Sequence, residues 1–122
     1  MFDLELAREI LKNISESLNK IVFRFEGINS SEDFLTSPAG SEKLDSICMQ
    51  LIVIGESLKN LDKITENNLL VKYPEIEWTK VKGLRDIISH HYFDVNEDAI
   101  FDICNNKIPP LAETIDKMIL EL

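Results

Sequence analysis

The sequence predicts a single all-α domain that folds as an up-and-down bundle of four to five helices. Apolar residues recur every three or four positions over long stretches, and no segment alternates with period two for long enough to form a strand. Gly and Pro number only four each, too few for a loop-rich or all-β fold. The length of 122 residues and the 44% of apolar residues suit one core, so we expect one domain over residues 1–122.

The first predicted helix covers about residues 2–25. Its apolar positions have the spacing of one helix face, at Leu4, Ala7, Leu11, Ile14, Leu18, Ile21 and Phe25. Gly27 and Asn29 are expected to end this helix. Residues 28–40 contain Ser, Pro and Gly residues, which predict a short helix at most, followed by a loop.

Ser41 is the predicted N-cap of the second long helix, whose apolar stripe reaches Leu61. Gly55 lies within this stripe, where glycine costs about 1 kcal/mol relative to alanine. A close contact with another helix is one explanation for the glycine.

The second half of the chain predicts four more helical segments. Residues 65–73 are typical of a short helix that ends before a proline. Residues 77–92 predict the third long helix. Asn96 is the predicted N-cap of a helix over residues 96–105, and a pair of prolines begins the last helix, over residues 109–122.

Composition limits the compartment and the partners. The net charge is −9, which disfavours a protein that coats nucleic acid or an anionic membrane with its whole surface. Cys48 and Cys104 lie in apolar helical patterns, so we expect buried thiols and no disulfide framework. The Cys and His spacing predicts no metal site, and nothing suggests a cofactor. Because no signal peptide and no apolar run of about 20 residues is found, we expect a cytoplasmic protein outside the membrane.

One block, residues 78–93, differs from the rest of the chain. It holds both histidines and three cations against one acid, so its formal charge is 3 − 1 = +2, and the remaining residues carry −9 − 2 = −11. A cationic region in an acidic protein indicates a site for an anion such as phosphate. Lys80, Lys82 and His91 are the candidate contacts to such a phosphate group.

Helical spacing relates the polar residues of this block to its apolar face. The positions that share one face are Trp78, Val81, Arg85, Ile88 and Tyr92. Because the other four are apolar or aromatic, Arg85 requires an anionic partner at a buried or half-buried face. Asp86 and His90 are four residues apart, so the carboxylate can orient the imidazole. Arg85 and His90 are about 140° apart on an ideal helix, and a bend or a second copy of the helix would bring them together.

Simpler interpretations of the same residues stay open. Arg85 can be a structural salt-bridge residue, and His90 and His91 can be cations favoured at a helix C-terminus. Lys80 and Lys82 can belong to a solvated face. On the residues alone, Tyr92 is best interpreted as a core tyrosine.

The segment Arg85-Asp86-Ile87-Ile88-Ser89-His90-His91-Tyr92 matches the Arg-x4-His-x-Tyr signature of HepT-like toxins of the HEPN superfamily. Trp78 to Leu84, Phe93-Asp94-Val95, Ile54-Gly55-Glu56-Ser57 and the proline-containing last segment also resemble that family. The likeness covers nearly the whole chain.

The resemblance implies a helical homodimer whose two motifs meet in a cleft and cleave RNA without a metal. In this interpretation Arg85 and His90 are the catalytic pair, and Asp86 supports His90. The resemblance also implies a toxin–antitoxin pair. Its antitoxin is an MntA-type nucleotidyltransferase, encoded beside the toxin, which transfers AMP to Tyr92 and silences the toxin.

Two other functions remain open at this point. The chain can be a catalytically inactive helical binding module that serves as partner and modification substrate of a nucleotidyltransferase. Its acidity favours this alternative, because a negative surface disfavours RNA binding. It can also be a structural helical dimer, in which Arg85 only forms a salt bridge.

Overall fold

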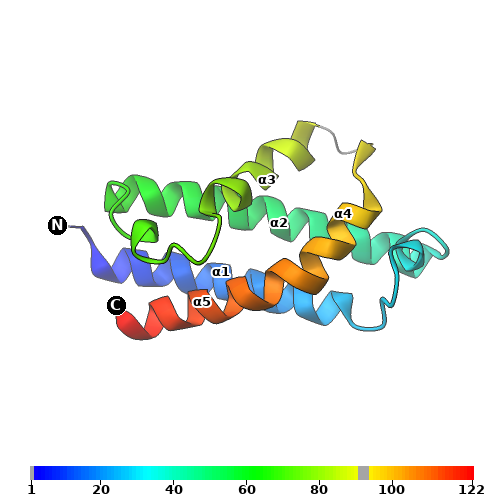
Figure 1. The fold of residues 1–122 in the computed structure, drawn as a ribbon, viewed down its shortest axis with the longest axis horizontal. Helices are drawn as coiled ribbons and strands as arrows, with labels where there is room; N and C mark the ends of the chain where they lie inside the picture. The colour runs from blue at the N-terminus through cyan, green and yellow to red at the C-terminus, as the bar shows by residue number, and fades with distance from the viewer. Residues whose placement is uncertain (1, 91–93) are drawn as a thin grey trace.

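A computed structural model describes residues 2–90 and 94–122, and every regular element in those residues is helical. Figure 1 shows the long segments running back and forth along one axis, with both termini at the same end of the bundle. These segments are α1 (Leu4–Phe25), α2 (Pro38–Thr65), α3 (Trp78–His90) and the stretch of residues 97–121. The predicted all-α bundle is confirmed.

The start of α1 is set by its cap. The Asp3 side chain accepts a hydrogen bond from the backbone N–H of Leu6 at 3.0 Å, so the helix begins at Leu4, two residues later than predicted. The predicted stripe then faces the core between α2 and the last helix, and its middle positions are fully buried. Gly27 follows the helix with φ +82°, a conformation that glycine adopts without strain.

The start of α2 differs from the prediction. Ser37, not Ser41, is the N-cap, and its hydroxyl accepts from the backbone N–H of Gly40 at 3.0 Å. Pro38 occupies the first helical position, where a missing N–H costs no hydrogen bond. The short helix expected before it is the 3₁₀ turn η1 (Ser31–Phe34).

Gly40 allows the first turn of α2 to pack on η1. A Cβ atom at this position would lie 2.0 Å from the carbonyl oxygen of Asp33. Only glycine fits this approach, which explains why helix can extend through residues that otherwise suggest a loop.

The helix predicted over residues 65–73 is wrong in its extent. Thr65 is the last residue of α2, and the next two residues, Glu66 and Asn67, have φ values of 53° and 62°. This left-handed pair breaks the helical path, and only the 3₁₀ turn η2 (Leu70–Lys72) follows.

The last part of the chain is one nearly continuous helical stretch. Asn96 caps α4 (Glu97–Asp102) as predicted, because its side chain accepts from the backbone N–H groups of Asp98 and Ala99. The helix does not end near residue 105. It widens into the π-helical turn η4 (Ile103–Lys107) and continues as α5 (Ile108–Glu121).

The two prolines of α5 explain the π turn. Pro109 and Pro110 have no N–H, so the carbonyl oxygens of Asn105 and Asn106 cannot receive the usual helical hydrogen bonds. The backbone N–H of Ile108 instead donates to the carbonyl of Ile103, five residues back. The prolines were expected to begin a separate last helix. In the structure they instead widen a helix that continues through them.

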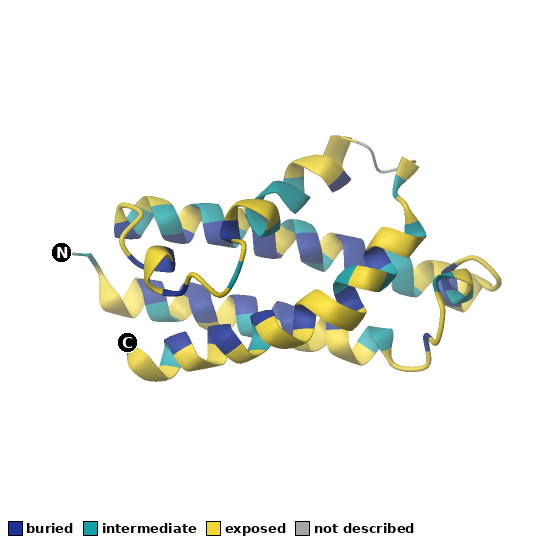
Figure 2. Cartoon of the chain, in the orientation of Figure 1, coloured by how far each residue is buried: buried dark blue, intermediate teal, exposed yellow. Residues whose placement is uncertain are grey.

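The core lies between α1, α2 and the last helix, and Figure 2 shows the buried residues as stripes along their facing sides. Cys48 and Cys104 are buried free thiols, as expected. Burial raises the pKa of Cys48 to about 11 and that of Cys104 to about 12. Among the described residues, no helix is long and apolar enough to cross a membrane, and His, Cys, Asp and Glu side chains form no cluster suited to a metal ion.

Helix α3 packs chiefly on α2, and the two helices approach each other closely at Gly55. A Cβ atom on Gly55 would lie 3.0 Å from the Cβ of Arg85 and 3.2 Å from both the backbone nitrogen of Arg85 and the carbonyl oxygen of Lys82. The close helix–helix contact offered as an explanation for this glycine is confirmed.

Gly55→Ala is expected to lower the free energy of unfolding. Alanine gains about 1 kcal/mol in helix propensity, but its methyl group would press on α3 backbone, and such overpacking costs about 1–3 kcal/mol. Gly83→Ala is the matched control, because no neighbouring atom lies within 4 Å of its would-be Cβ. This control should stabilise the protein by up to about 1 kcal/mol. Urea unfolding followed by circular dichroism compares the two, and equal stabilisation by both would contradict the close approach.

Candidate functional site

The second half of α3 stands on the surface. Ile88 is buried, whereas Asp86, Ile87, Ser89 and His90 are exposed. Figure 2 shows mostly exposed positions at this end of α3, which rises away from the rest of the bundle. Of the residues predicted to carry chemistry, Asp86 and His90 are therefore open to a ligand or a partner.

Arg85 has the anionic partner that its half-buried position requires. Its Nε lies 3.2 Å from Oε2 of Glu56 on α2, and its Nη1 lies 3.0 Å from Oδ1 of Asp86. The hydrogen bond to Asp86 and the charge of Glu56 raise the pKa of Arg85. With 41% of the side chain exposed, the guanidinium is held by carboxylates but remains accessible from solvent. Glu56 was not predicted as a partner of Arg85.

Asp86 bridges two cations. Besides Arg85, it accepts a hydrogen bond from Nζ of Lys59 on α2 at 3.1 Å. The Arg85 hydrogen bond, followed by the one from Lys59, lowers the pKa of Asp86. Within the described residues, the ion pairs of Asp86 are with these two cations, whereas the sequence suggested a contact with His90. His90 itself lies exposed in the last turn of α3.

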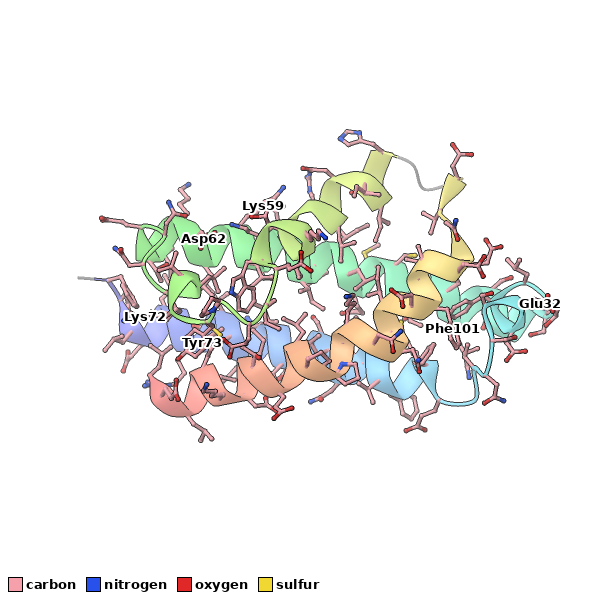
Figure 3. All side chains as sticks on the ribbon, viewed as in Figure 1. Glu32, Lys59, Asp62, Lys72, Tyr73 and Phe101 are labelled. Carbon is pink, nitrogen blue, oxygen red and sulfur yellow. The ribbon has the colours of Figure 1, made fainter. Side chains whose placement is uncertain are left out.

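The two candidate phosphate lysines of α3 are also paired. Lys82 binds Asp62 of α2 in a partly buried pair, with 26% and 13% of the side chains exposed. Lys80 lies 3.0 Å from Glu77 in an exposed pair, and this contact lowers the pKa of Glu77. Lys82 thus anchors the beginning of α3 to α2. Figure 3 labels Lys59 and Asp62, which lie along the part of α2 that faces α3.

The remaining predicted site residues, His91 and Tyr92, lie outside the described residues. Of the expected α3 face, Trp78 and Ile88 are buried, and Val81 and Arg85 are half-buried. The indole N–H of Trp78 donates to the carbonyl of Tyr73 at 2.8 Å, which fixes the start of the helix. The apolar face was therefore predicted correctly for the four positions that the structure describes.

Two surface cavities flank this region. The larger, of about 540 Å³, lies at the beginning of α3 and is lined by Asp62, Asn67, Leu70, Val71, Ile76, Glu77, Trp78, Thr79, Lys80 and Lys82. The smaller, of about 360 Å³, lies on α2 beside Arg85 and is lined by Glu56, Ser57, Lys59, Asn60 and Lys63.

Comparison with known proteins identifies the family. The family model described as "Ribonuclease HepT-like" matches residues 4–118. The chain belongs to the HepT-like family. A Methanocaldococcus jannaschii protein named as a candidate RNase is 31% identical over 94% of this chain and 88% of its own length. A candidate RNase of Caldanaerobacter subterraneus is 28% identical over 95% and 96% of the two chains. No solved structure is significantly similar to the chain.

A third relative carries the family name itself. A Thermococcus cleftensis protein named "Probable ribonuclease HepT" is 26% identical over 91% of this chain and 94% of its own. In this HepT-like chain, the first residue of the motif, Arg85, packs against Gly55 of α2. The contact between α2 and α3 therefore positions the motif. The resemblance identified from the sequence is confirmed.

Removal of Lys59 should raise the pKa of Asp86 toward its ordinary value, because the carboxylate loses one of two cations. Lys59→Gln is the test, and Arg85→Gln should raise that pKa further, since the Arg85 hydrogen bond is the largest cause of the shift. Lys117→Gln is the control, because Lys117 pairs with Glu75. A ¹³C NMR titration of the Asp86 carboxyl measures all three. An Asp86 pKa unmoved by Lys59→Gln would contradict the bridge.

Proposed function

We propose that this HepT-like chain is a metal-independent ribonuclease and the toxin of a toxin–antitoxin pair, with Arg85 and His90 as its catalytic residues. The observation that carries the proposal is the arrangement of the motif on α3. Arg85 packs against Gly55 of α2 and binds Glu56, and His90 is exposed at the end of the helix. The family and the names of its relatives support RNA as the substrate.

The residue types suit cleavage by the ribose 2′-hydroxyl. The 2′-oxygen attacks the adjacent phosphorus, its proton passes to a general base, and the 5′-oxygen leaves with a proton from a general acid. The imidazole of His90 can act as the general base or as the general acid. Arg85 can stabilise the negative charge that builds up on the phosphoryl oxygens. Among the described residues, carboxylates contact its Nε and Nη1, which leaves Nη2 for phosphate.

Loss of cleavage in two variants tests the assignment. His90→Ala should lower RNA cleavage by about 100-fold or more, because it removes an acid–base group. Arg85→Lys should also lose about 100-fold, since lysine cannot reproduce the planar guanidinium fork. Both variants should relieve growth arrest on expression, whereas Lys12→Gln, an exposed position on α1, should behave as wild type. Undiminished cleavage and toxicity in both motif variants would exclude this mechanism.

The proposed enzyme is a homodimer in which each copy contributes to the cleft. The support is a set of exposed apolar side chains on the two helices that form the site: Met49 and Val53 on α2 and Ile87 on α3 are 57%, 37% and 59% exposed. Met49 and Val53 are one turn apart on α2, on the same stripe as Glu56, and Ile87 lies two residues after Arg85. Large apolar side chains that remain exposed near a polar site are often buried when a protein partner binds.

Ile87→Lys is expected to convert the dimer into a monomer, because a lysine charge would be desolvated at the interface. Leu120→Lys on α5 is the matched control, since Leu120 is 87% exposed and lies on another helix. Size-exclusion chromatography with light scattering gives the mass of each. A wild-type monomer, or an Ile87→Lys dimer of undiminished stability, would contradict the proposed interface.

We propose in addition that an MntA-type nucleotidyltransferase silences the toxin by transfer of AMP to Tyr92. The support is the Arg-x4-His-x-Tyr spacing, which places a phenol two residues after His90. A nucleotide on Tyr92 would bring negative charge toward Arg85 and compete with RNA phosphate. Mass spectrometry after co-expression of the two proteins tests this step, with Tyr92→Phe as the unmodified control.

The second candidate is an inactive binding module that only serves as partner and modification substrate. The observation that favours it is the pairing on α3, where Lys80, Lys82 and Arg85 all contact carboxylates. Modification of Tyr92 without any RNA cleavage by the unmodified wild type would select this candidate.

A further inference from the structure

The exposed face of α2 is apolar before Glu56, the residue that binds Arg85, and polar after it. Met49, Val53, Glu56, Asn60 and Lys63 follow one another at spacings of four and three residues and so share one face of the helix. The first two are apolar, Glu56 binds Arg85, and the last two are polar. The apolar half was assigned above to a second copy of the chain, which leaves the polar half to be explained.

The polar half of the stripe is hollowed. Ser57, Lys59, Asn60 and Lys63 line the cavity of about 360 Å³ together with Glu56. We call this surface the α2 depression. Four of its five lining residues carry hydrogen-bond donors, two of them ammonium groups. The fifth, Glu56, already binds the Arg85 guanidinium.

The depression is continuous with the motif helix. Glu56 contacts Arg85 at 3.2 Å, and Lys59 contacts Asp86 at 3.1 Å. Two residues that line the depression therefore form ion pairs with the motif. From residue 56 to residue 63 the helix rises about 10 Å, enough for an RNA strand to extend past the phosphate at Arg85. The next phosphate along the strand would then lie over α2.

The charge of this region favours a phosphate. Lys59, Lys63 and Arg85 against Glu56 and Asp86 give 3 − 2 = +1, on a chain of net charge −9. No ion pair of Lys63 is found within residues 2–90 and 94–122. The larger cavity is a poorer candidate, because its two lysines, Lys80 and Lys82, are both bound to carboxylates.

We infer that the α2 depression binds the RNA phosphate that neighbours the cleaved one, with Lys63 as its main contact and Lys59 and Asn60 beside it. The inference rests on the proposed ribonuclease function. It assigns to α2 a substrate contact that the motif does not contain. Binding there would orient the strand so that the scissile phosphate lies at Arg85.

Lys63→Gln tests the inference in a His90→Ala background, in which bound RNA should stay intact. The affinity for a single-stranded oligonucleotide should fall about threefold to tenfold at low salt. The slope of log affinity against log salt should become less steep by about 0.7, the value of one lost phosphate contact on a single strand. Lys63→Arg should retain the wild-type affinity and slope.

Lys20→Gln, on the exposed face of α1, is the matched control because it removes the same charge elsewhere. Equal affinities and slopes for Lys63→Gln and Lys20→Gln would overturn the inference, even if the wild type cleaves RNA. Absence of RNA cleavage by the wild type would instead reject the proposed function. Weaker RNA binding by Lys63→Gln but not by Lys20→Gln would support the subsite, as would slower RNA cleavage by Lys63→Gln in the otherwise wild-type protein.

Discussion

The contact between Gly55 and Arg85 determines the geometry of the whole candidate site. Because Gly55 has no side chain, the backbone of α3 lies directly against α2, with the Cβ of Arg85 at 3.0 Å from the position a Gly55 Cβ would occupy. The stem of Arg85 is therefore fixed before its guanidinium makes any bond. A fixed stem lowers the side-chain entropy lost when the guanidinium binds Glu56 or a phosphate. This matters because α3 packs chiefly on α2, so their contact sets the position of the motif.

Opposite charges along α2 and α3 hold this contact in register. Lys82 meets Asp62, Asp86 meets Lys59, and Arg85 meets Glu56, so cations and carboxylates alternate between the helices. The two more exposed pairs, those of Asp86 and Arg85, contribute little stability, and their main effect is to fix the rotation of α3. The cationic block in the sequence is thus neutralised largely by α2. An incoming phosphate competes with carboxylates that already bind Arg85, which is why additional cations on α2 would matter for RNA binding.

The long helices and the need of Arg85 for an anion could be predicted because both follow from local spacing. The start of α2 at Ser37 was missed although Ser37-Pro38 is a local signal for a helix start, because helix through Gly40 depends on the packing of Gly40 against Asp33. The partner of Asp86 also could not be predicted from the helical spacing. His90 is one turn away on the same helix, whereas Lys59 comes from α2, and only the packing of the two helices brings it within 3.1 Å. Contacts between helices thus determine the partners of Asp86 and Arg85, which local spacing left open.

The proposed dimer would account both for the cleavage chemistry and for the exposed apolar side chains near the motif. Cleavage by a 2′-hydroxyl requires one group to accept a proton and another to donate one, whereas each motif contributes one His90, about 140° around the helix from Arg85. In the proposed dimer, a two-fold axis would use each residue twice and bring both motifs into one cleft. Burial of Ile87 would also remove water from the neighbouring ion pairs and strengthen them. Assembly and catalysis would then depend on the same contact, and a change that separates the copies would stop cleavage without altering Arg85 or His90.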